Sequence, residues 1–217
     1  MRYKAVLFDN DGTVLNTDRL VFNAWSALGR ELRPEGIDLD DVKKHFGRTL
    51  LEAAVLLAEE YGIKDYDLDK LDKTYWAYQD AHHEEIDGIY PGIKELMSAL
   101  KERGILTAVV TSGHNGGCDI ELGEFGIRQY IDVIIGSEDI DRAKPDPDPA
   151  LKACQKLGVK PEETIFIGDS RHDMNCGKTA GCTTVLVGWS TFRDKGLKGN
   201  EIPDYIFDDV TEVLGLL

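Results

Sequence analysis

Two pairs of aspartates carry the chemistry that this sequence suggests first. Asp9 and Asp11 stand two residues apart directly after an apolar run, and Gly12 behind them allows a sharp turn. Asp169 and Asp173 follow a second apolar run. Acids gathered at one place repel one another unless a cation lies between them, and carboxylate oxygens suit Mg²⁺. One acid of the first pair could attack a substrate while the other moves protons.

Two better-known motifs do not account for these segments. If Gly12 took the glycine position of a calcium loop, Leu7 would replace the first acidic ligand, and a strand would precede the loop instead of a helix. The segment 177–179 is similar to the end of an ATP-binding loop, but the glycine needed five residues before Gly177 is His172. Neither motif is complete.

The chain alternates strands and helices outside one segment. Apolar runs predict strands at residues 3–8, 105–110, 133–135, 164–167 and 184–187. The alternation indicates an α/β fold, a Rossmann-like parallel sheet with helices on both faces. Polar residues follow three of the strands: Asp9 with Asp11, Thr111 with Ser112, and Asp169. Ligands bind at the carboxyl ends of parallel strands, so these three loops should converge.

Residues 16–87 interrupt the alternation. Apolar residues there keep helical spacing and predict four helices, the last over 68–83, with no strong strand. We therefore expect an α/β core from 1–15 and 88–217, with 16–87 as an inserted all-helical domain. A chain of 217 residues is long enough for such a core and a smaller insert, but not for two full-sized domains.

Charge and hydropathy limit the expected partners. The 25 basic and 40 acidic residues give a formal charge of −15, which repels nucleic acid and anionic membrane surfaces. No apolar run approaches the roughly 20 residues needed to cross a bilayer, so we expect a cytoplasmic protein. We also expect it to be a monomer or a weak homodimer. The cysteines are too sparse for a disulfide framework, and we expect reduced, buried thiols at Cys118, Cys154, Cys176 and Cys182.

Four motifs in this order resemble the haloacid dehalogenase superfamily of phosphohydrolases. They are Asp-x-Asp-Gly-Thr at 9–13, a hydroxyl after an apolar strand at Thr111, the lysine Lys144, and Gly-Asp-x-x-x-Asp at 168–173. The resemblance spans nearly the whole chain. It also covers the insert at 16–87, which is similar to the helical cap of that family.

The resemblance implies roles for the four aspartates. Asp9 would be the nucleophile that forms an aspartyl-phosphate. Asp11 would protonate the leaving oxygen and later deprotonate the attacking water. Mg²⁺ would be held by the Asp9 carboxylate, the Asp11 carbonyl and Asp169, with Asp173 assisting.

The resemblance also implies a cradle for a small phosphorylated metabolite. Thr111 and Lys144 would hold phosphate oxygens, and the backbone amides of Asn10, Asp11 and Ser112 would complete the cradle. Such local positive potential lets a chain of charge −15 bind phosphate. Asn10 departs from the family, which is often apolar there, and we expect its side chain to point away from the phosphate.

Within that family, the residues favour a phosphatase. Dehalogenases usually lack the second aspartate and the metal, so Asp11 and Asp169 argue against that activity. Sugar phosphomutases carry a histidine twelve residues after the nucleophile, where this chain has Val21. We expect Mg²⁺-dependent hydrolysis of a small phosphate monoester similar to phosphoglycolate. Inorganic pyrophosphatase, a β-phosphoglucomutase-like mutase and a non-catalytic phosphometabolite-binding module are the alternatives.

The cap is expected to set specificity, because the core handles only the phosphate. The cap carries nine basic and 17 acidic side chains, so a basic residue that faces the substrate would be unusual and is a candidate anion contact. Arg48, between two expected cap helices, could grip a carboxylate or a second phosphate; the alternative is a solvated arginine at a helix start. We expect His82 and His83 to be surface or hinge residues.

Overall fold

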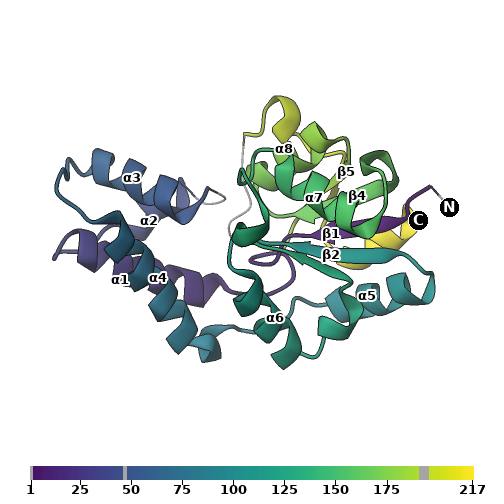
Figure 1. Ribbon diagram of the computed structural model, residues 1–217, viewed down its shortest axis with the longest axis horizontal. Helices are drawn as coiled ribbons and strands as arrows, with labels where there is room; N and C mark the ends of the chain where they lie inside the picture. The colour runs from purple at the N-terminus through teal and green to yellow at the C-terminus, as the bar shows by residue number, and fades with distance from the viewer. Residues whose placement is uncertain (1, 46–47, 191–195) are drawn as a thin grey trace. The chain divides into compact units, whose positions relative to one another are not determined.

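The computed structural model describes residues 2–45, 48–190 and 196–217. It divides into two compact units: Met1–Asn16 with Gly88–Leu217, here called the core unit, and Thr17–Asp87, called the cap unit. Figure 1 traces the chain through both. Asn16, which the sequence placed in the insert, groups with the core unit because its backbone N–H donates to the carbonyl of Gly88 at 2.8 Å.

The core unit is built on one parallel sheet with strand order β3-β2-β1-β4-β5-β6. The strands are β1 (Ala5–Phe8), β2 (Leu106–Val110), β3 (Val133–Ile135), β4 (Thr164–Gly168), β5 (Thr183–Val187) and β6 (Tyr205–Phe207). The sequence predicted the first five. It missed β6, because this three-residue edge strand exposes Tyr205 and Ile206 and so shows no buried apolar run.

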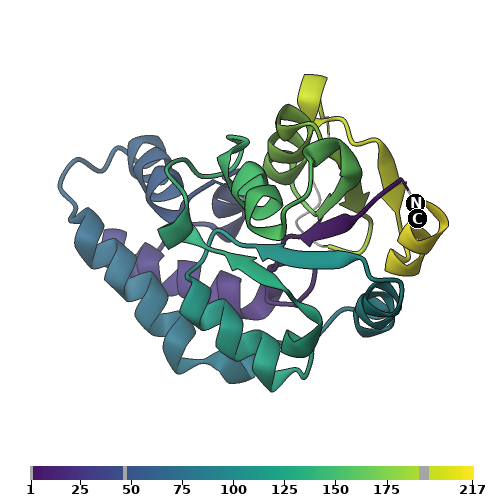
Figure 2. The same cartoon turned by 45° about the vertical axis from the view of Figure 1, so that its right-hand side comes forward.

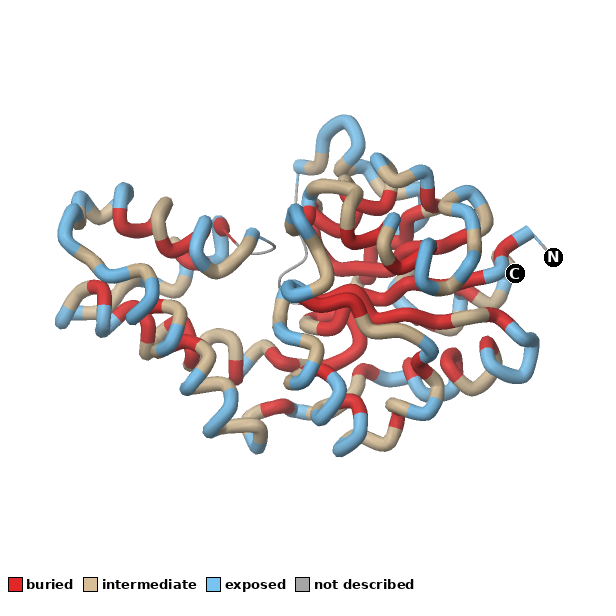
Figure 3. The backbone as a smooth tube through the Cα atoms, in the orientation of Figure 1, coloured by how far each residue is buried: buried red, intermediate tan, exposed pale blue. Residues whose placement is uncertain are grey.

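Helices cover both faces of the sheet, as the alternation predicted. They are α5 (Ile93–Glu102), α6 (Asn115–Glu124), α7 (Asp148–Leu157) and α8 (Arg171–Ala180). α5 and α6 lie on one face, and α7 and α8 lie on the other (Figures 1 and 2). The middle strands β1 and β4 are buried along their whole length, and the tube of Figure 3 is red there. Burial on both faces explains their unbroken apolar runs.

The described residues of the cap unit contain four α-helices with an apolar core of their own. They are α1 (Asp18–Leu32), α2 (Leu39–Lys43), α3 (Leu50–Glu60) and α4 (Leu68–Ala81). Trp25, Leu28, Leu57, Leu71 and Tyr75 pack together between them. Residues 17–45 and 48–87 contain no strand. α4 ends two residues before the predicted boundary, because the chain turns into a separate short helix there.

Short 3-10 helices complete the described secondary structure. They are η1 (His83–Glu85), η2 (Arg128–Tyr130), η3 (Ser137–Asp139), η4 (Pro161–Glu163), η5 (Gly199–Glu201) and η6 (Val210–Gly215). No described helix combines the length and the apolar character that a bilayer span needs. All four cysteines are buried and unbridged, as the sequence predicted.

The close packing of α8 on the sheet yields a stability prediction. A Cβ added at Gly177 would lie 2.8 Å from Thr184 Cγ2 and 3.1 Å from Phe166 Cβ. We expect Gly177→Ala to lower the free energy of unfolding by about 1–2 kcal/mol, because overpacking outweighs the helix propensity of alanine. Urea denaturation would measure the change.

The matched control for this prediction is a glycine in another core-unit helix. A Cβ at Gly123 in α6 would meet no atom within 4 Å. Gly123→Ala should therefore raise the free energy of unfolding by about 0.5–1 kcal/mol, through helix propensity alone. If both variants were equally stabilised, the contact between α8 and the strands would be looser than described.

Candidate active site

Three aspartates converge at the carboxyl ends of β1 and β4. Asp9 directly follows β1, Asp169 directly follows β4, and Asp173 lies in the first turn of α8. The two strands are parallel neighbours with Phe8 opposite Ile167, so their ends lie side by side. One carboxylate oxygen of each aspartate lies within 4.8 Å of those of the other two, and all three residues are buried. We call these three residues the acid cluster.

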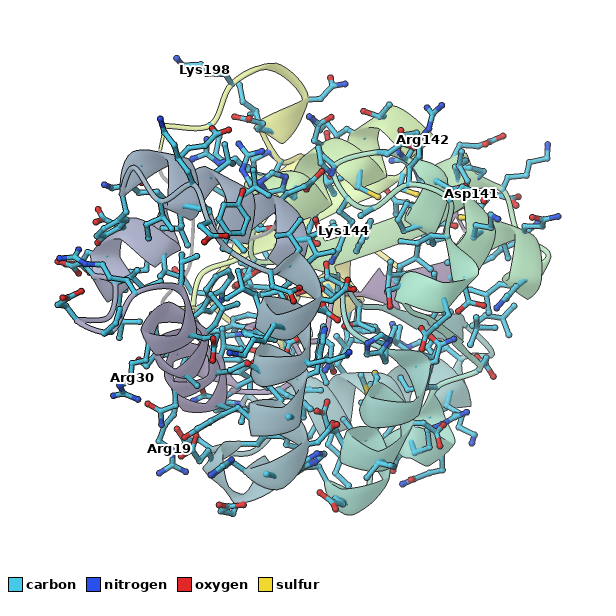
Figure 4. The ribbon with its side chains drawn as sticks, turned by 60° about the vertical axis from the view of Figure 1, so that its left-hand side comes forward. Arg19, Arg30, Asp141, Arg142, Lys144 and Lys198 are labelled. Atoms are coloured by element: carbon cyan, nitrogen blue, oxygen red, sulfur yellow. The ribbon has the colours of Figure 1, made fainter. Side chains whose placement is uncertain are left out.

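Lys144 joins two members of the acid cluster. Its Nζ donates to Asp9 Oδ1 at 2.6 Å and to Asp173 Oδ1 at 2.8 Å. Lys144 is only 6% exposed, whereas its loop neighbours Asp141 and Arg142 are exposed and point outward in Figure 4. The lysine is therefore an interior group at the strand ends and not the surface lysine that its sequence context alone would suggest.

The start of α8 explains how Asp173 is held. Ser170 is the helix N-cap, and its hydroxyl donates to Asp173 Oδ2 at 2.6 Å while its backbone N–H donates to the same oxygen at 3.1 Å. A Cβ at Gly168 would lie 2.4 Å from the Asp173 Cβ. Only glycine in the last position of β4 lets the helix start so close to the strand.

Burial and like charges dominate the electrostatics of the acid cluster. Burial raises the pKa of Asp9 to about 7; Lys144 opposes this shift, and Asp173 and Asp11 add to it. Burial likewise raises the pKa of Asp169 well above its usual range, with the charges of Asp9 and Asp173 adding to the shift. Burial works to lower the pKa of Lys144, but the carboxylates of Asp173 and Asp9 outweigh it and raise that pKa, so the amine stays protonated.

The charges of this group match a divalent cation. When ionised, the three carboxylates of the acid cluster and the single ammonium of Lys144 leave two negative charges in a buried place. Hard carboxylate oxygens at this spacing are the donors that Mg²⁺ prefers. The donor set therefore fits a divalent metal ion with oxygen ligands.

Thr111 and Ser112 follow β2 at the same edge of the sheet. Phe8 of β1 pairs with Val109, which brings Thr111 beside the loop that carries Asp9. Thr111 is buried, and its Oγ1 accepts from the backbone N–H of Gly113 at 3.0 Å, so its own proton stays available for donation. Ser112 is exposed.

The loop after β1 is organised around Asn10. The Asn10 carbonyl accepts hydrogen bonds from the three amides of residues 13–15, which folds the loop tightly behind Asp11. The Asn10 side chain turns toward α6, where its Nδ2 donates to Glu121 Oε2 at 3.2 Å. Asp11 is partly exposed, unlike the acid cluster. Gly12 has a φ of 74°, a left-handed conformation that glycine adopts readily.

The sequence missed two side chains that bear on this site. Glu121 holds Asn10 from the facing helix, and no local pattern in α6 marks it. Ser190 Oγ donates to Asp169 Oδ2 at 2.6 Å. Ser190 lies just beyond the carboxyl end of β5, so the strand-end rule that selected Asp9 and Thr111 could have selected it too.

The residues named in the cap unit are described within that unit. Arg48 is exposed and lies between α2 and α3, and its backbone N–H donates to the His45 carbonyl at 3.2 Å. Its neighbours 46 and 47 lie outside the described residues. The His82 ring stacks on Tyr78 with centroids 4.0 Å apart, and His83 lies in η1. None of these groups belongs to the acid cluster.

Comparisons with known proteins agree on one family. A model of the haloacid dehalogenase-like hydrolase family matches residues 6–187. The pyrophosphatase PpaX of Halalkalibacterium halodurans is 31% identical over 217 residues, which covers 100% of this chain and 98% of that protein.

Solved structures share the same architecture. The crystal structure of a predicted phosphoglycolate phosphatase from Haemophilus somnus superposes with a TM-score of 0.81 at 27% identity, covering 100% of this chain and 98% of that one. The β-phosphoglucomutase of Clostridium difficile superposes with a TM-score of 0.83, covering 97% and 93% of the two chains. At 21% identity, the second likeness shows the fold alone.

The raised pKa of Asp9 predicts how stability depends on pH without metal. Its pKa rises from 3.8 to about 7 on folding, so its contribution is largest below 3.8 and is lost as the pH rises towards 7. We expect the free energy of unfolding, measured in EDTA, to fall as the pH rises from about 4 to about 7 and to level off above that. Asp9→Asn should make this profile less steep, because an amide does not titrate, and Asp169, whose pKa is also raised, keeps part of the slope.

Asp139 supplies the control for this measurement. Its pKa is lowered to about 2, mainly by hydrogen bonds from Lys156 and Asn115 that outweigh its burial, so it stays ionised across the same pH range. Asp139→Asn should change the stability without changing the slope. An Asp9→Asn profile as steep as that of the unmodified chain would mean that Asp9 is not the group that titrates.

Proposed function

Since this chain belongs to the haloacid dehalogenase-like hydrolase family, we propose that it is a Mg²⁺-dependent phosphatase of small phosphate compounds that works through an aspartyl-phosphate. The observation that carries the proposal is the buried Lys144 ammonium, which bonds to Asp9 Oδ1 at 2.6 Å and to Asp173 Oδ1 at 2.8 Å. Asp169 completes the acid cluster beside them. A phosphatase needs a fixed nucleophile, a fixed cation and a metal site at one place.

The acid cluster would hold the metal ion in this proposal. Asp9, Asp169 and Asp173 supply the oxygens, and the backbone carbonyl of Asp11 is a further candidate ligand. When bound, Mg²⁺ neutralises charge that develops on the phosphoryl oxygens. The chain's own residues would carry out the remaining steps.

Asp9 and Asp11 would share the bond-making steps. A carboxylate oxygen of Asp9 attacks phosphorus, the bond to the leaving oxygen breaks, and Asp11 gives that oxygen its proton. Asp11 then takes a proton from water, which attacks phosphorus and frees the Asp9 carboxylate. The partial exposure of Asp11 suits a group that exchanges protons with water, and the burial of Asp9 suits a nucleophile that must shed its hydration.

Lys144 and Thr111 would hold the phosphoryl group during these steps. The Lys144 ammonium already contacts Asp9, so it is placed to contact a phosphoryl oxygen on the attacking carboxylate. The Thr111 hydroxyl keeps a proton to donate. The amides of Asn10, Asp11 and Ser112 would complete the cradle, and the hydrogen bonds to the Asn10 carbonyl fix the loop that presents them.

We propose a small phosphorylated acid such as phosphoglycolate as the substrate, with inorganic pyrophosphate as the second candidate. The solved structure at 27% identity has the first activity in its name, and the relative at 31% identity has the second. Both substrates join a phosphoryl group to a second anion, which Arg48 of the cap unit could grip. Comparing kcat/KM for the two compounds would separate the candidates.

Phosphomutase activity is disfavoured by a packed side chain. Val21, which stands twelve residues after Asp9, packs against the apolar core of the cap unit. An apolar residue in that setting supplies no group to control proton transfer. Water, and not a second sugar hydroxyl, should therefore accept the phosphoryl group.

The nucleophile assignment is tested by Asp9→Asn. We expect turnover of either substrate to fall by at least about a thousandfold, because the amide cannot form the phosphoryl intermediate. The fold should survive, because the amide oxygen still accepts from Lys144. Phosphate release with circular dichroism would measure both effects. Near-normal turnover by a folded Asp9→Asn variant would exclude the covalent route.

The cap assignment is tested by Arg48→Ala. If Arg48 grips the second anion, kcat/KM for phosphoglycolate or pyrophosphate should fall roughly ten- to a hundredfold, the loss of about 1.5 to 3 kcal/mol of charge-assisted binding. A phosphate ester with an uncharged tail should lose much less. Both substrates use the same groups at the phosphate, so their ratio isolates the tail contact.

Lys64→Ala is the matched control, since Lys64 is another exposed cation of the cap unit. It changes the net charge as Arg48→Ala does and should leave both substrates unaffected. Equal losses for the two substrates with Arg48→Ala would assign Arg48 to cap closure. Unchanged kinetics would leave it a solvated surface residue.

A further inference from the structure

Asp169 is held by a hydroxyl from the next strand. Ser190 Oγ donates to Asp169 Oδ2 at 2.6 Å, and both residues are at least nine-tenths buried. Asp169 follows β4, and Ser190 stands three residues beyond the end of β5. These strands are parallel neighbours with Gly168 opposite Leu186, so the register brings the two side chains to the same edge.

The loop after β1 packs closely against both Asp169 and Ser190. A Cβ added at Gly12 would lie 2.3 Å from Asp169 Oδ2 and 3.0 Å from Ser190 Oγ. The carboxylate and the hydroxyl are thus packed against the backbone that carries Asp9 and Asp11. Rotation of the Asp169 carboxylate towards that loop is blocked, and the hydroxyl defines the orientation that remains.

Asp169 differs from the rest of the acid cluster in what stabilises its charge. Asp9 and Asp173 are ion-paired with Lys144. Asp169 instead accepts a hydrogen bond from Ser190 at 2.6 Å; burial raises the pKa of Asp169, and both this hydrogen bond and the charge of Lys144 oppose that rise. An ammonium bonded to Asp169 would compete with a metal ion for its charge. A hydroxyl orients the carboxylate and leaves that charge in place.

We infer that Ser190 is a positioning residue that fixes Asp169 in the orientation needed to bind the divalent cation. This inference rests on the metal site of the proposed function and adds a group from β5 to it. It requires that loss of the hydroxyl weakens metal binding while saturating metal still supports turnover. A purely structural role for Ser190 would leave metal affinity unchanged.

The test is a Mg²⁺ titration of Ser190→Ala by calorimetry on the chain without substrate. We expect the Mg²⁺ affinity to fall roughly ten- to a hundredfold, as is usual when a group that orients a metal ligand is removed. In phosphate-release assays, the Mg²⁺ concentration for half-maximal activity should rise by a similar factor. The kcat at saturating Mg²⁺ should recover to within a few-fold of the unmodified value.

Thr184→Val is the matched control. The Thr184 hydroxyl donates to Asp204 Oδ2 at 3.0 Å, so this change removes a hydroxyl–carboxylate bond from the opposite end of the same strand. It keeps the methyl group that lies near Gly177 and should leave Mg²⁺ affinity unchanged. If Ser190→Ala does not fold, Ser190→Cys, of similar size and with a weak donor, replaces it with the same expected loss.

The outcomes separate this inference from the proposed function. Unchanged Mg²⁺ affinity in a folded Ser190 variant would overturn the inference and leave the function intact. A fall in kcat that saturating Mg²⁺ does not relieve would also overturn it, because Ser190 would then act on another step. Failure of the unmodified chain to bind Mg²⁺ would contradict the metal site itself, and the positioning role with it.

Discussion

The buried ammonium of Lys144 is the interaction on which the rest of the site depends. Asp9, Asp173 and Lys144 lie together away from water, where an unpaired charge is costly. The ammonium stabilises the two ionised carboxylates, and they stabilise the protonated ammonium. Removing the lysine would leave Asp9 and Asp173 facing each other uncompensated. The geometry around them follows from that constraint: a glycine ends β4 so that α8 can start close by, and the helix N-cap holds the second oxygen of Asp173.

The acid cluster carries more negative charge, when ionised, than the Lys144 ammonium can neutralise. Asp169 has a hydroxyl partner, and the pKa values of Asp9 and Asp169 are raised by burial. These raised pKa values favour the protonated acids in a metal-free chain, so binding of a metal ion would release protons. In the proposed mechanism, phosphate recognition and metal binding would be linked, because two of the acids that would hold the cation, Asp9 and Asp173, are also bonded to Lys144.

Two patterns in the sequence, apolar runs for strands and helical spacing for helices, predicted most of the fold. One topological rule predicted which side chains meet. Continuous apolar runs located β1, β2, β4 and β5, and the rule that ligands bind at the carboxyl ends of parallel strands brought Asp9, Thr111 and Asp169 together. The same patterns could not find β6, which is short and exposed, or Glu121, which reaches Asn10 through a tertiary contact. Lys144 is predicted only through the family resemblance and not through these patterns, because its partners Asp9 and Asp173 lie 135 and 29 residues away along the chain.

The point where the core chain departs at Asn16 and returns at Gly88 is closed by its own backbone. Asn16 N–H bonds to the Gly88 carbonyl, Tyr90 N–H bonds to the Val14 carbonyl, and Leu15 bridges Ile89. These bonds join the two ends of the core chain directly, and the 71 residues between them take no part in them. Because doubling a loop costs only about 0.6 kcal/mol of closure entropy, evolution can lengthen, shorten or exchange that insertion at small cost to the core. The acid cluster and Lys144 therefore keep their places in the core unit when the insertion changes.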